Sequence, residues 1–299
     1  MKNLRTDTQR FYLGKWWASG VRTCVSGAES VSERFDSILK IFLFMPAEFL
    51  PSLSPAAWVM VCVAAFATGM SKAGLAGISM LGVTLTALAM DGMASTGVVL
   101  PLLIFADLLA VTTFREHIQW HQIRRLAWPV GVGLVLGWLS MLAMQEHREV
   151  FRPLVGGIVL AMLALQLLRQ KFPQFDRGLP HSLAFAWGAG ILTGLTTMIA
   201  NAAGPVAGIY LLILALPKSQ FISTMAWLFL LVNLAKIPFS LHLGLIHSSS
   251  LALNLCQAPF VIAGLFAGKL LVATIPQASF QRLVLILAGA SALCLIGIR

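Results

Sequence analysis

Apolar residues along this chain fall into ten runs that polar or glycine-rich stretches separate. The first five runs lie at residues 56–70, 75–90, 94–113, 126–145 and 150–168. The second five lie at 183–199, 203–216, 220–241, 249–272 and 280–298. Each set has two short runs followed by three long ones. Because a helix needs about 20 apolar residues to cross a bilayer, each short pair is expected to form half-helices or a re-entrant hairpin.

Glycine and polar residues interrupt the apolar pattern inside both short pairs. The first break, residues 69–77, contains Gly69, Ser71, Lys72, Gly74 and Gly77. The second break, residues 194–205, contains Thr196, Thr197, Asn201, Gly204 and Pro205. Lipid cannot satisfy freed backbone groups, so irregular backbone at membrane depth is buried in protein or lines a water-filled cavity. Two breaks at matching positions of two halves are typical of a transporter's binding site.

Other residues also match between the two sets of runs. Pro129, Gly133 and Gly137 correspond to Pro259, Gly264 and Gly268, and Thr96 corresponds to Thr224. The spacing of these glycines allows close helix packing and needs no chemical role. The sequence therefore predicts an all-α polytopic membrane protein with two homologous halves. Each half, 56–168 or 183–299, has a glycine-broken short helix pair and three long transmembrane helices, and a basic linker at 169–182 joins them.

The first 55 residues form a polar extension in this interpretation. Residues 1–36 carry charges of both signs and lack the apolar core and cleavage site of a signal peptide. The apolar patch at 38–50 is too short to cross a bilayer and contains Glu48, which favours an interfacial helix. An alternative is that translation begins at Met45, leaving residues 1–44 untranslated in the native protein.

Composition and charge support a membrane protein. Of the 299 residues, 58% are hydrophobic and 11% are charged, against about 25% charged in typical soluble domains. The net charge of +10 comes from loops and the N-terminus, so it indicates topology and not nucleic-acid binding. Basic residues collect in cytoplasmic loops, which places 115–125 and 169–181 in the cytoplasm of a multi-pass inner-membrane protein. The number of crossings is eight or ten, depending on whether each short pair makes one crossing or two.

The two breaks have the chemistry of an anion site. Backbone amides freed at the breaks and the positive ends of half-helices favour an anion, and Lys72 adds a full charge. Ser71, Thr196, Thr197 and Asn201 can donate hydrogen bonds to an oxyanion. The alternatives are that Lys72 extends to a headgroup interface and that the hydroxyl and amide groups only tie helices together.

Two ionisable residues, Asp107 and Lys236, lie well inside long apolar runs at nearly equivalent positions. Charges at such depth cost several kcal/mol, so these residues are expected to face the protein interior and find a partner. They either pair with each other as a static link or form part of a coupling or gating path for protons or substrate. Asn233, one helical turn before Lys236, lies on the same helical face.

The remaining polar residues indicate no cofactor, metal site or enzyme. The cysteines show no metal-binding spacing, and Cys62, Cys256 and Cys294 lie inside apolar runs as small hydrophobic residues. His117, His121, His242 and His247 flank run ends, where solvated loop positions explain them. The chain has no P-loop, dinucleotide fingerprint or zinc-protease motif.

The chain resembles the TauE/SafE family of sulfite-exporter-like permeases over essentially everything after residue 55. In the first half the resemblance rests on the first break, Leu100–Ile104, Ala106–Leu108, Phe114, Arg115 and Trp120. In the second half it rests on Asn201–Pro205, Ile209–Leu212, Thr224, Asn233 and Lys236. The resemblance implies a permease for sulfur oxyanions or small organic anions.

The predicted function is secondary transport of a small anion, such as sulfite or an organosulfonate, across the cytoplasmic membrane. The expected partners are the small anion, protons as a candidate coupling ion, and the lipid bilayer that surrounds the protein. The sequence leaves the oligomeric state open. The alternatives are an anion channel of the same fold and a non-transporting subunit of a membrane assembly.

Overall fold

The computed structural model describes residues 53–73, 78–90, 92–114, 118–171, 183–214 and 216–274, with Leu293 and Gly297 beyond them. All of these residues belong to one compact unit of the chain, residues 48–299. Most of the predicted N-terminal extension lies outside the described residues. So do most of the linker at 169–182 and all but two residues of the last apolar run at 280–298.

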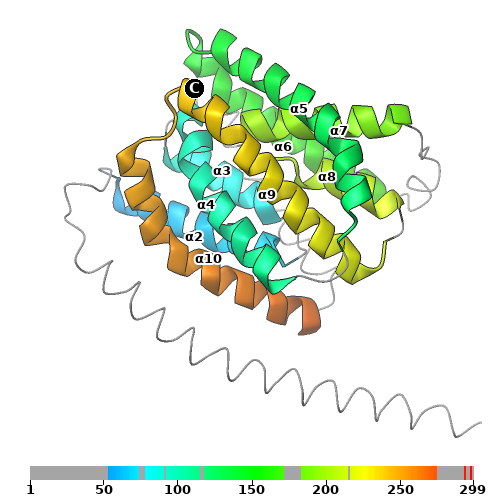
Figure 1. Ribbon diagram of the computed structural model, residues 1–299. Coiled ribbons are helices and arrows are strands. Elements are labelled where there is room, and N and C mark those ends of the chain that lie inside the picture. Colours follow the sequence, from blue (N-terminus) through cyan, green and yellow to red (C-terminus); the bar gives the residue numbers. More distant parts are fainter. Residues whose placement is uncertain are drawn as a thin grey trace, which may run out of the picture. The chain divides into compact units, whose positions relative to one another are not determined.

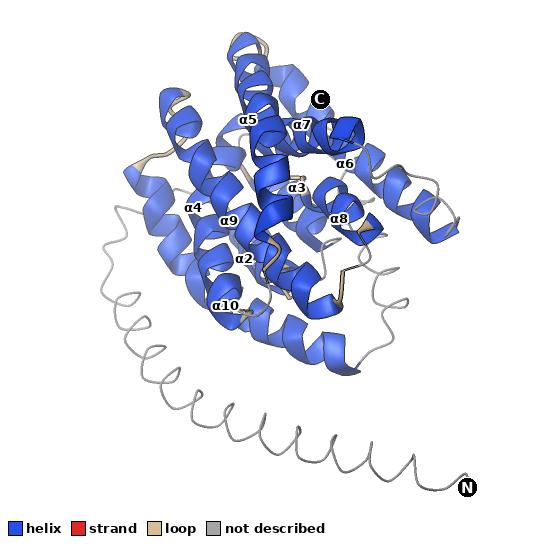
Figure 2. Ribbon diagram, turned by 45° about the vertical axis from the view of Figure 1, so that its right-hand side comes forward, coloured by secondary structure: helices blue, strands red, loops and turns tan. Residues whose placement is uncertain are grey.

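The described part of the chain is entirely helical, with no strand in it (Figures 1 and 2). The helices are α2 (Pro55–Ser71), α3 (Ser79–Ala89), α4 (Gly92–Thr113), α5 (Trp120–Ala143), α6 (Arg148–Lys171), α7 (Leu183–Ala200), α8 (Gly204–Ile213), α9 (Lys218–His242) and α10 (Ser248–Thr274). Five of the described helices are long and apolar enough to cross a membrane: α4, α5, α7, α9 and α10. The all-α membrane fold predicted from the sequence is therefore confirmed.

Both breaks separate two helices, as the apolar pattern predicts. The helices that follow the breaks, α3 with 11 residues and α8 with 10, rise about 15 Å, about half of a bilayer core. The helices that precede the breaks are longer. α2 has 17 residues, and α7 with 18 is a candidate span by itself, so the half-helix description fits α3 and α8 and does not fit α7.

Some helices extend beyond their apolar runs. α5 begins at Trp120, so Arg124 and Arg125 are helical and only part of the predicted loop at 115–125 lies outside a helix. α6 continues to Lys171 and takes the first residues of the predicted linker. Backbone hydrogen bonding does not stop where hydrocarbon ends, so a hydropathy boundary underestimates the length of such helices.

α2 and α10 approach each other closely because glycine removes the side chain at the contact. A Cβ atom on Gly69 would overlap the carbonyl oxygen of Val261 in α10. A Cβ atom on Gly264 would overlap the carbonyl oxygen of Phe66 in α2. Both views show α2 beside α10 (Figures 1 and 2). Backbone-to-backbone contact of this kind is how small residues join helices in a membrane.

α5 and α7 form a second interface that is built in the same way. A Cβ atom on Gly194 would overlap the carbonyl oxygen of Val130 in α5, and one on Gly133 would overlap the carbonyl oxygen of Ile191 in α7. A broken-pair helix thus packs on a long helix at each interface, α2 on α10 and α7 on α5. α4 and α9 contact each other; α4 also packs on α10 and α9 on α5.

Candidate functional site

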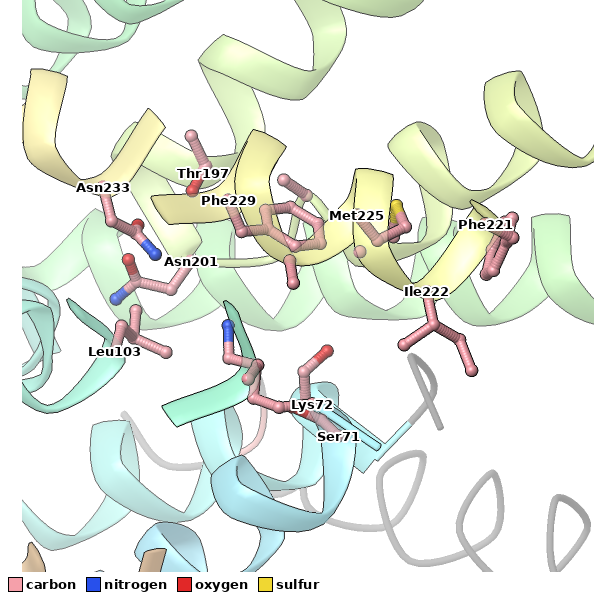
Figure 3. A pocket seen from close by; sticks show the side chains of 15 residues that line it. Ser71, Lys72, Leu103, Thr197, Asn201, Phe221, Ile222, Met225, Phe229 and Asn233 are labelled. Carbon is pink, nitrogen blue, oxygen red and sulfur yellow. The ribbon is translucent and has the colours of Figure 1, made fainter. Parts of the chain in front are cut away.

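A cavity of about 60 Å³ lies where the ends of α2 and α7 meet the starts of α3 and α8, with α4 and α9 forming its sides (Figure 3). A water molecule needs about 10–15 Å³ of cavity volume. The cavity therefore has room for a few waters or one small ion. Its polar lining residues are Ser71, Lys72, Ser79, Thr197, Asn201 and Asn233.

The two ends of the cavity differ in character. Figure 3 shows Lys72, Asn201 and Asn233 gathered at one end. Toward the other end lie Phe221, Ile222 and Met225 of α9. A polar end with an apolar approach is the usual form of a small-molecule site, in which a few polar groups fix the orientation of the ligand.

Lys72 points inward and forms an ion pair. It is the C-cap residue that follows α2, and its side chain is 10% exposed. Its Nζ lies 2.6 Å from Oδ1 of Asp107 in α4 and 5.2 Å from the ring centroid of Phe229. The other carboxylate oxygen of Asp107 accepts a 2.6 Å hydrogen bond from Asn233 Nδ2. The alternative that Lys72 extends to a headgroup interface is therefore not what the structure shows.

Lys236 is bound by neutral oxygen atoms. It is 1% exposed, and its Nζ donates to the Thr197 carbonyl oxygen at 2.7 Å and to Asn201 Oδ1. Of the two alternatives for Asp107 and Lys236, the direct ion pair is not what the structure shows, because Asp107 pairs with Lys72 instead. Lys236 reaches the last turn of α7, where the negative end of the helix dipole favours a cation.

Asn201 ends α7 and connects three helices. Its backbone has φ of 51°, a left-handed conformation in which asparagine is one of the few tolerated residues. Its backbone N–H donates to the Thr197 carbonyl oxygen at 3.0 Å, and its Nδ2 donates to the Thr96 carbonyl oxygen of α4 at 3.2 Å. With Oδ1 held by Lys236, the side chain has a fixed orientation at the wall of the cavity.

Five of the predicted binding residues line this cavity: Ser71, Lys72, Thr197, Asn201 and Gly204. Three others serve different roles in the structure. Gly69 packs against α10, Thr196 bonds back to the Leu192 carbonyl oxygen at 2.7 Å, and Pro205 lies in the first turn of α8. Gly74 and Gly77 lie outside the described residues. Of the predicted coupling residues, Asn233 lines the cavity, and Asp107 and Lys236 lie behind lining residues.

The sequence analysis missed the apolar wall of the cavity. Leu103, Met225 and Phe229 line it, but such residues in an apolar helix look the same as lipid-facing ones. A signal was present in α9, because Ile222, Met225, Phe229 and Asn233 follow one another at spacings of three or four and so share one helical face with the polar residue.

The described cysteines and histidines form no second site. Cys62 and Cys256 are free thiols. His121, His242 and His247 are exposed, and His242 lies edge-on to Trp138 with ring centroids 5.3 Å apart. Among the residues described, no group of three or more His, Cys, Asp or Glu residues is placed to hold a metal ion. His117, Cys24 and Cys294 lie outside that part of the chain.

Comparison with protein families agrees with the residues at this site. The family model described as sulfite exporter TauE/SafE matches residues 61–295. The match contains the two breaks, the cavity and all of the charged residues around it. No curated protein and no solved structure matches the chain. The matched residues make up most of the sequence, so the chain belongs to the TauE/SafE family of sulfite exporters, a family of membrane transporters.

Proposed function

We propose that this protein is a secondary transporter that moves a small anion across the cytoplasmic membrane by alternating access. The anion is a sulfur oxyanion such as sulfite, or an organosulfonate. The observation that carries the proposal is Lys72, an almost fully buried lysine that lines a cavity between two broken helix pairs. A buried charge in a membrane protein generally marks a substrate or ion path. The protein acts as a carrier in this proposal and has no enzymatic activity.

The helix ends around the cavity support an anionic substrate. Ser79 in the first turn of α3 and Gly204 at the start of α8 both line the cavity. The first amides of a helix have no partner within the helix, and the dipole is positive at that end. Two helix starts and one lysine therefore face a single small space, and broken-helix transporters bind anionic groups with helix starts of this kind.

The size of the cavity supports a substrate of a few heavy atoms. A volume of about 60 Å³ suits sulfite or a short sulfonate, whereas a nucleotide or a lipid would need a much larger space. The aromatic and aliphatic side chains on α9 keep water from the apolar end of the cavity, which strengthens electrostatic attraction at the polar end.

The repeated packing supports alternating access. The α2–α10 and α5–α7 interfaces use glycine contacts of the same type, and α4 and α9 contact each other between them. We infer that the two halves are homologous repeats and that each interface moves as a rigid body. Rocking of one such body against the other around a fixed site is the usual mechanism of repeat transporters.

The contacts at the start of α9 support an opening toward the cytoplasm. Gln119 donates through Nε2 to Gln220 Oε1 at 2.9 Å and through its backbone N–H to Thr224 Oγ1 at 3.0 Å. These contacts join the start of α9 to the region predicted to be a cytoplasmic loop. Phe221 and Ile222 follow directly, so the apolar end of the cavity leads toward that side.

Asp107 and Asn233 have a gating role in this proposal. Asp107 forms an ion pair with Lys72, and an arriving anion competes with this carboxylate for the same ammonium group. Binding would weaken the link between the first break and α4. This exchange of partners would couple anion binding to movement of the first break relative to α4. Protons are a candidate coupling ion.

The test is anion flux in proteoliposomes that contain the purified full-length protein. Sulfite loss from loaded vesicles should depend on the protein, and accumulation against a gradient when a proton gradient is imposed would separate a carrier from a channel. Lys72→Ala should lower the rate at least about tenfold, since it removes a buried charge worth several kcal/mol to an anion. Lys269→Ala changes an exposed lysine of α10 and should transport normally. Normal flux in Lys72→Ala vesicles would overturn the proposal.

A further inference from the structure

The buried charges around the cavity do not cancel. Lys72 and Asp107 form a matched pair at 2.6 Å, but Lys236 contacts a carbonyl oxygen and an amide oxygen. Among the described residues, no carboxylate lies within salt-bridge distance of the Lys236 ammonium group. With all three of these side chains ionised, the cluster carries two positive charges and one negative charge, a net charge of +1.

The unmatched charge acts on the cavity through Asn201. Lys236 does not line the cavity, whereas Asn201 does. Its Oδ1 accepts from the Lys236 ammonium group, and one N–H of its Nδ2 goes to the Thr96 carbonyl oxygen. An amide nitrogen has two N–H groups, so one remains for a ligand. A hydrogen bond from Lys236 to the amide oxygen makes that remaining N–H a stronger donor, because linked hydrogen bonds polarise one another.

The net charge favours a ligand with one negative charge. A monoanion near Lys72 and Asn201 brings the buried cluster to neutrality. A dianion brings it to −1 and so leaves a buried excess charge of the opposite sign, which costs several kcal/mol. The cost of removing an ion from water also rises with the square of its charge, so it is about four times as large for a dianion of the same size.

The apolar wall adds to this preference. Leu103, Met225 and Phe229 offer no hydrogen bonds in place of the water that an entering anion loses. Lys72 Nζ lies 5.2 Å from the ring centroid of Phe229 and 2.6 Å from Oδ1 of Asp107, and these two contacts hold its ammonium group at the polar end. An anion with a small apolar group could place that group against the wall and its oxygen atoms toward Lys72 and Asn201.

We infer that the cavity binds one singly charged sulfonate or oxyanion between Lys72, Asn201 and Asn233, and that Lys236 sets this charge preference through Asn201. Dianions such as sulfate are bound poorly, and sulfite is bound as the hydrogen sulfite monoanion. This inference rests on the proposed function, since it names the charge state of the anion at the same site. Lys236 is a specificity-determining residue in this scheme and does not touch the ligand.

Methanesulfonate and sulfate are a matched pair of probes, because both are tetrahedral around sulfur and they differ by one charge. Binding to the detergent-purified full-length protein can be measured by titration with a shift in thermal unfolding as the readout. The wild-type protein should bind methanesulfonate at least about tenfold more tightly than sulfate, which corresponds to about 1.4 kcal/mol. Equal binding, or tighter binding of sulfate, would overturn the inference and leave the proposed function intact. Binding of neither probe would count against both.

Two variants change the net charge in opposite directions. Asp107→Asn raises the cluster to +2 and should move the ratio of the two affinities toward sulfate by at least about tenfold. Asn201→Asp lowers it to zero by placing a carboxylate next to Lys236, and aspartate tolerates the left-handed backbone of this position. The Asn201→Asp protein should unfold at a higher temperature and lose methanesulfonate binding. Methanesulfonate binding unchanged in Asn201→Asp, or an unchanged ratio in a folded Asp107→Asn protein, would contradict the role of net charge.

Discussion

The two breaks face the same cavity but supply positive charge in different ways. At the first break the helix ends at Ser71, and the next residue, Lys72, itself carries the charge into the cavity. At the second break the neutral Asn201 takes the corresponding place. The positive charge there belongs to Lys236 of α9, which binds Asn201 and does not line the cavity. The first break thus provides a direct cation that needs a carboxylate partner. The second provides a neutral donor whose strength depends on a cation outside the cavity.

This difference shows that similar broken helices need not contribute similar chemistry. Lys72 is balanced by Asp107, so the first break has no net charge of its own. Lys236 is balanced by helix carbonyls and an amide, so the second break keeps its charge. An anion between them can take an ammonium contact from one side and a polarised amide from the other. The comparison can be tested by removing the partner at each break.

Loss of the carboxylate at the first break should have the largest effect on stability. In Asp107→Ala, Lys72 stays buried without its partner, and breaking one side of a buried ion pair costs about 3–5 kcal/mol. Unfolding by a denaturing detergent should therefore occur at a much lower denaturant fraction than in the wild-type protein. The double variant Lys72→Met with Asp107→Leu removes both charges and should regain most of this stability, without transport.

Removal of the cation at the second break should destabilise the protein less than Asp107→Ala does. Lys236→Met leaves Asn201 Oδ1 without a donor, whereas the Thr197 carbonyl oxygen keeps its hydrogen bond from the Asn201 backbone N–H. Unsatisfied acceptors cost about 1–3 kcal/mol, and removal of an unmatched buried charge offsets part of that cost. If Lys236→Met destabilises the protein as much as Asp107→Ala does, the two breaks do not differ in charge balance as described here.

The helix interfaces on either side of the breaks should respond alike. Gly69→Ala and Gly194→Ala each place a Cβ atom against a backbone carbonyl of the partner helix, and such overpacking costs about 1–3 kcal/mol. Gly188→Ala is the control, since a Cβ atom there meets nothing within 4 Å and alanine favours helix by up to about 1 kcal/mol. The unfolding midpoints of the three variants, compared with that of the wild-type protein, measure these changes in stability. Loss of stability at only one interface would show that the two are not equivalent.

Much of the fold could be predicted from the sequence because membrane helices obey length and polarity limits. The long run at 94–113 became α4 within two residues, since lipid forces an apolar run of that length into a helix. The boundary of α5 was misplaced because Arg124 and Arg125 are helical without being apolar. Hydropathy reports the surroundings of a residue, whereas a helix ends where its hydrogen bonds end.

The candidate site was less predictable than the fold. The sequence indicates that Asp107 and Lys236 are buried and need partners, because charge at membrane depth is costly. It does not say which partners, and Lys72 pairs with the carboxylate that one of the two alternatives gave to Lys236. Partner choice depends on how far each side chain reaches across the packed helices. The role of Gly69 was equally hidden, since a glycine in a break can serve the cavity or a helix contact.

The backbone at the two breaks allows the smallest and most specific comparison. Asn201 is left-handed, with φ of 51°, whereas Lys72 is right-handed, with φ of −73°. Alanine in the left-handed region costs about 1–2 kcal/mol and glycine does not. Asn201→Ala and Asn201→Gly both lose the amide, so any difference between them reports the backbone alone. Asn201→Gly should be the more stable of the two by about 1 kcal/mol.

At the first break this preference should be absent or reversed. Lys72→Ala and Lys72→Gly both remove the charge, and a right-handed helix end gives glycine no conformational advantage. The glycine variant should then be equally or less stable, because its unfolded chain has more freedom to lose. Unfolding free energies of the four variants give two differences, and only the one at Asn201 should favour glycine. Equal differences would mean that the left-handed turn at Asn201 is not what ends α7, and the second break would then depend on its hydrogen bonds to Lys236 and Thr96 instead.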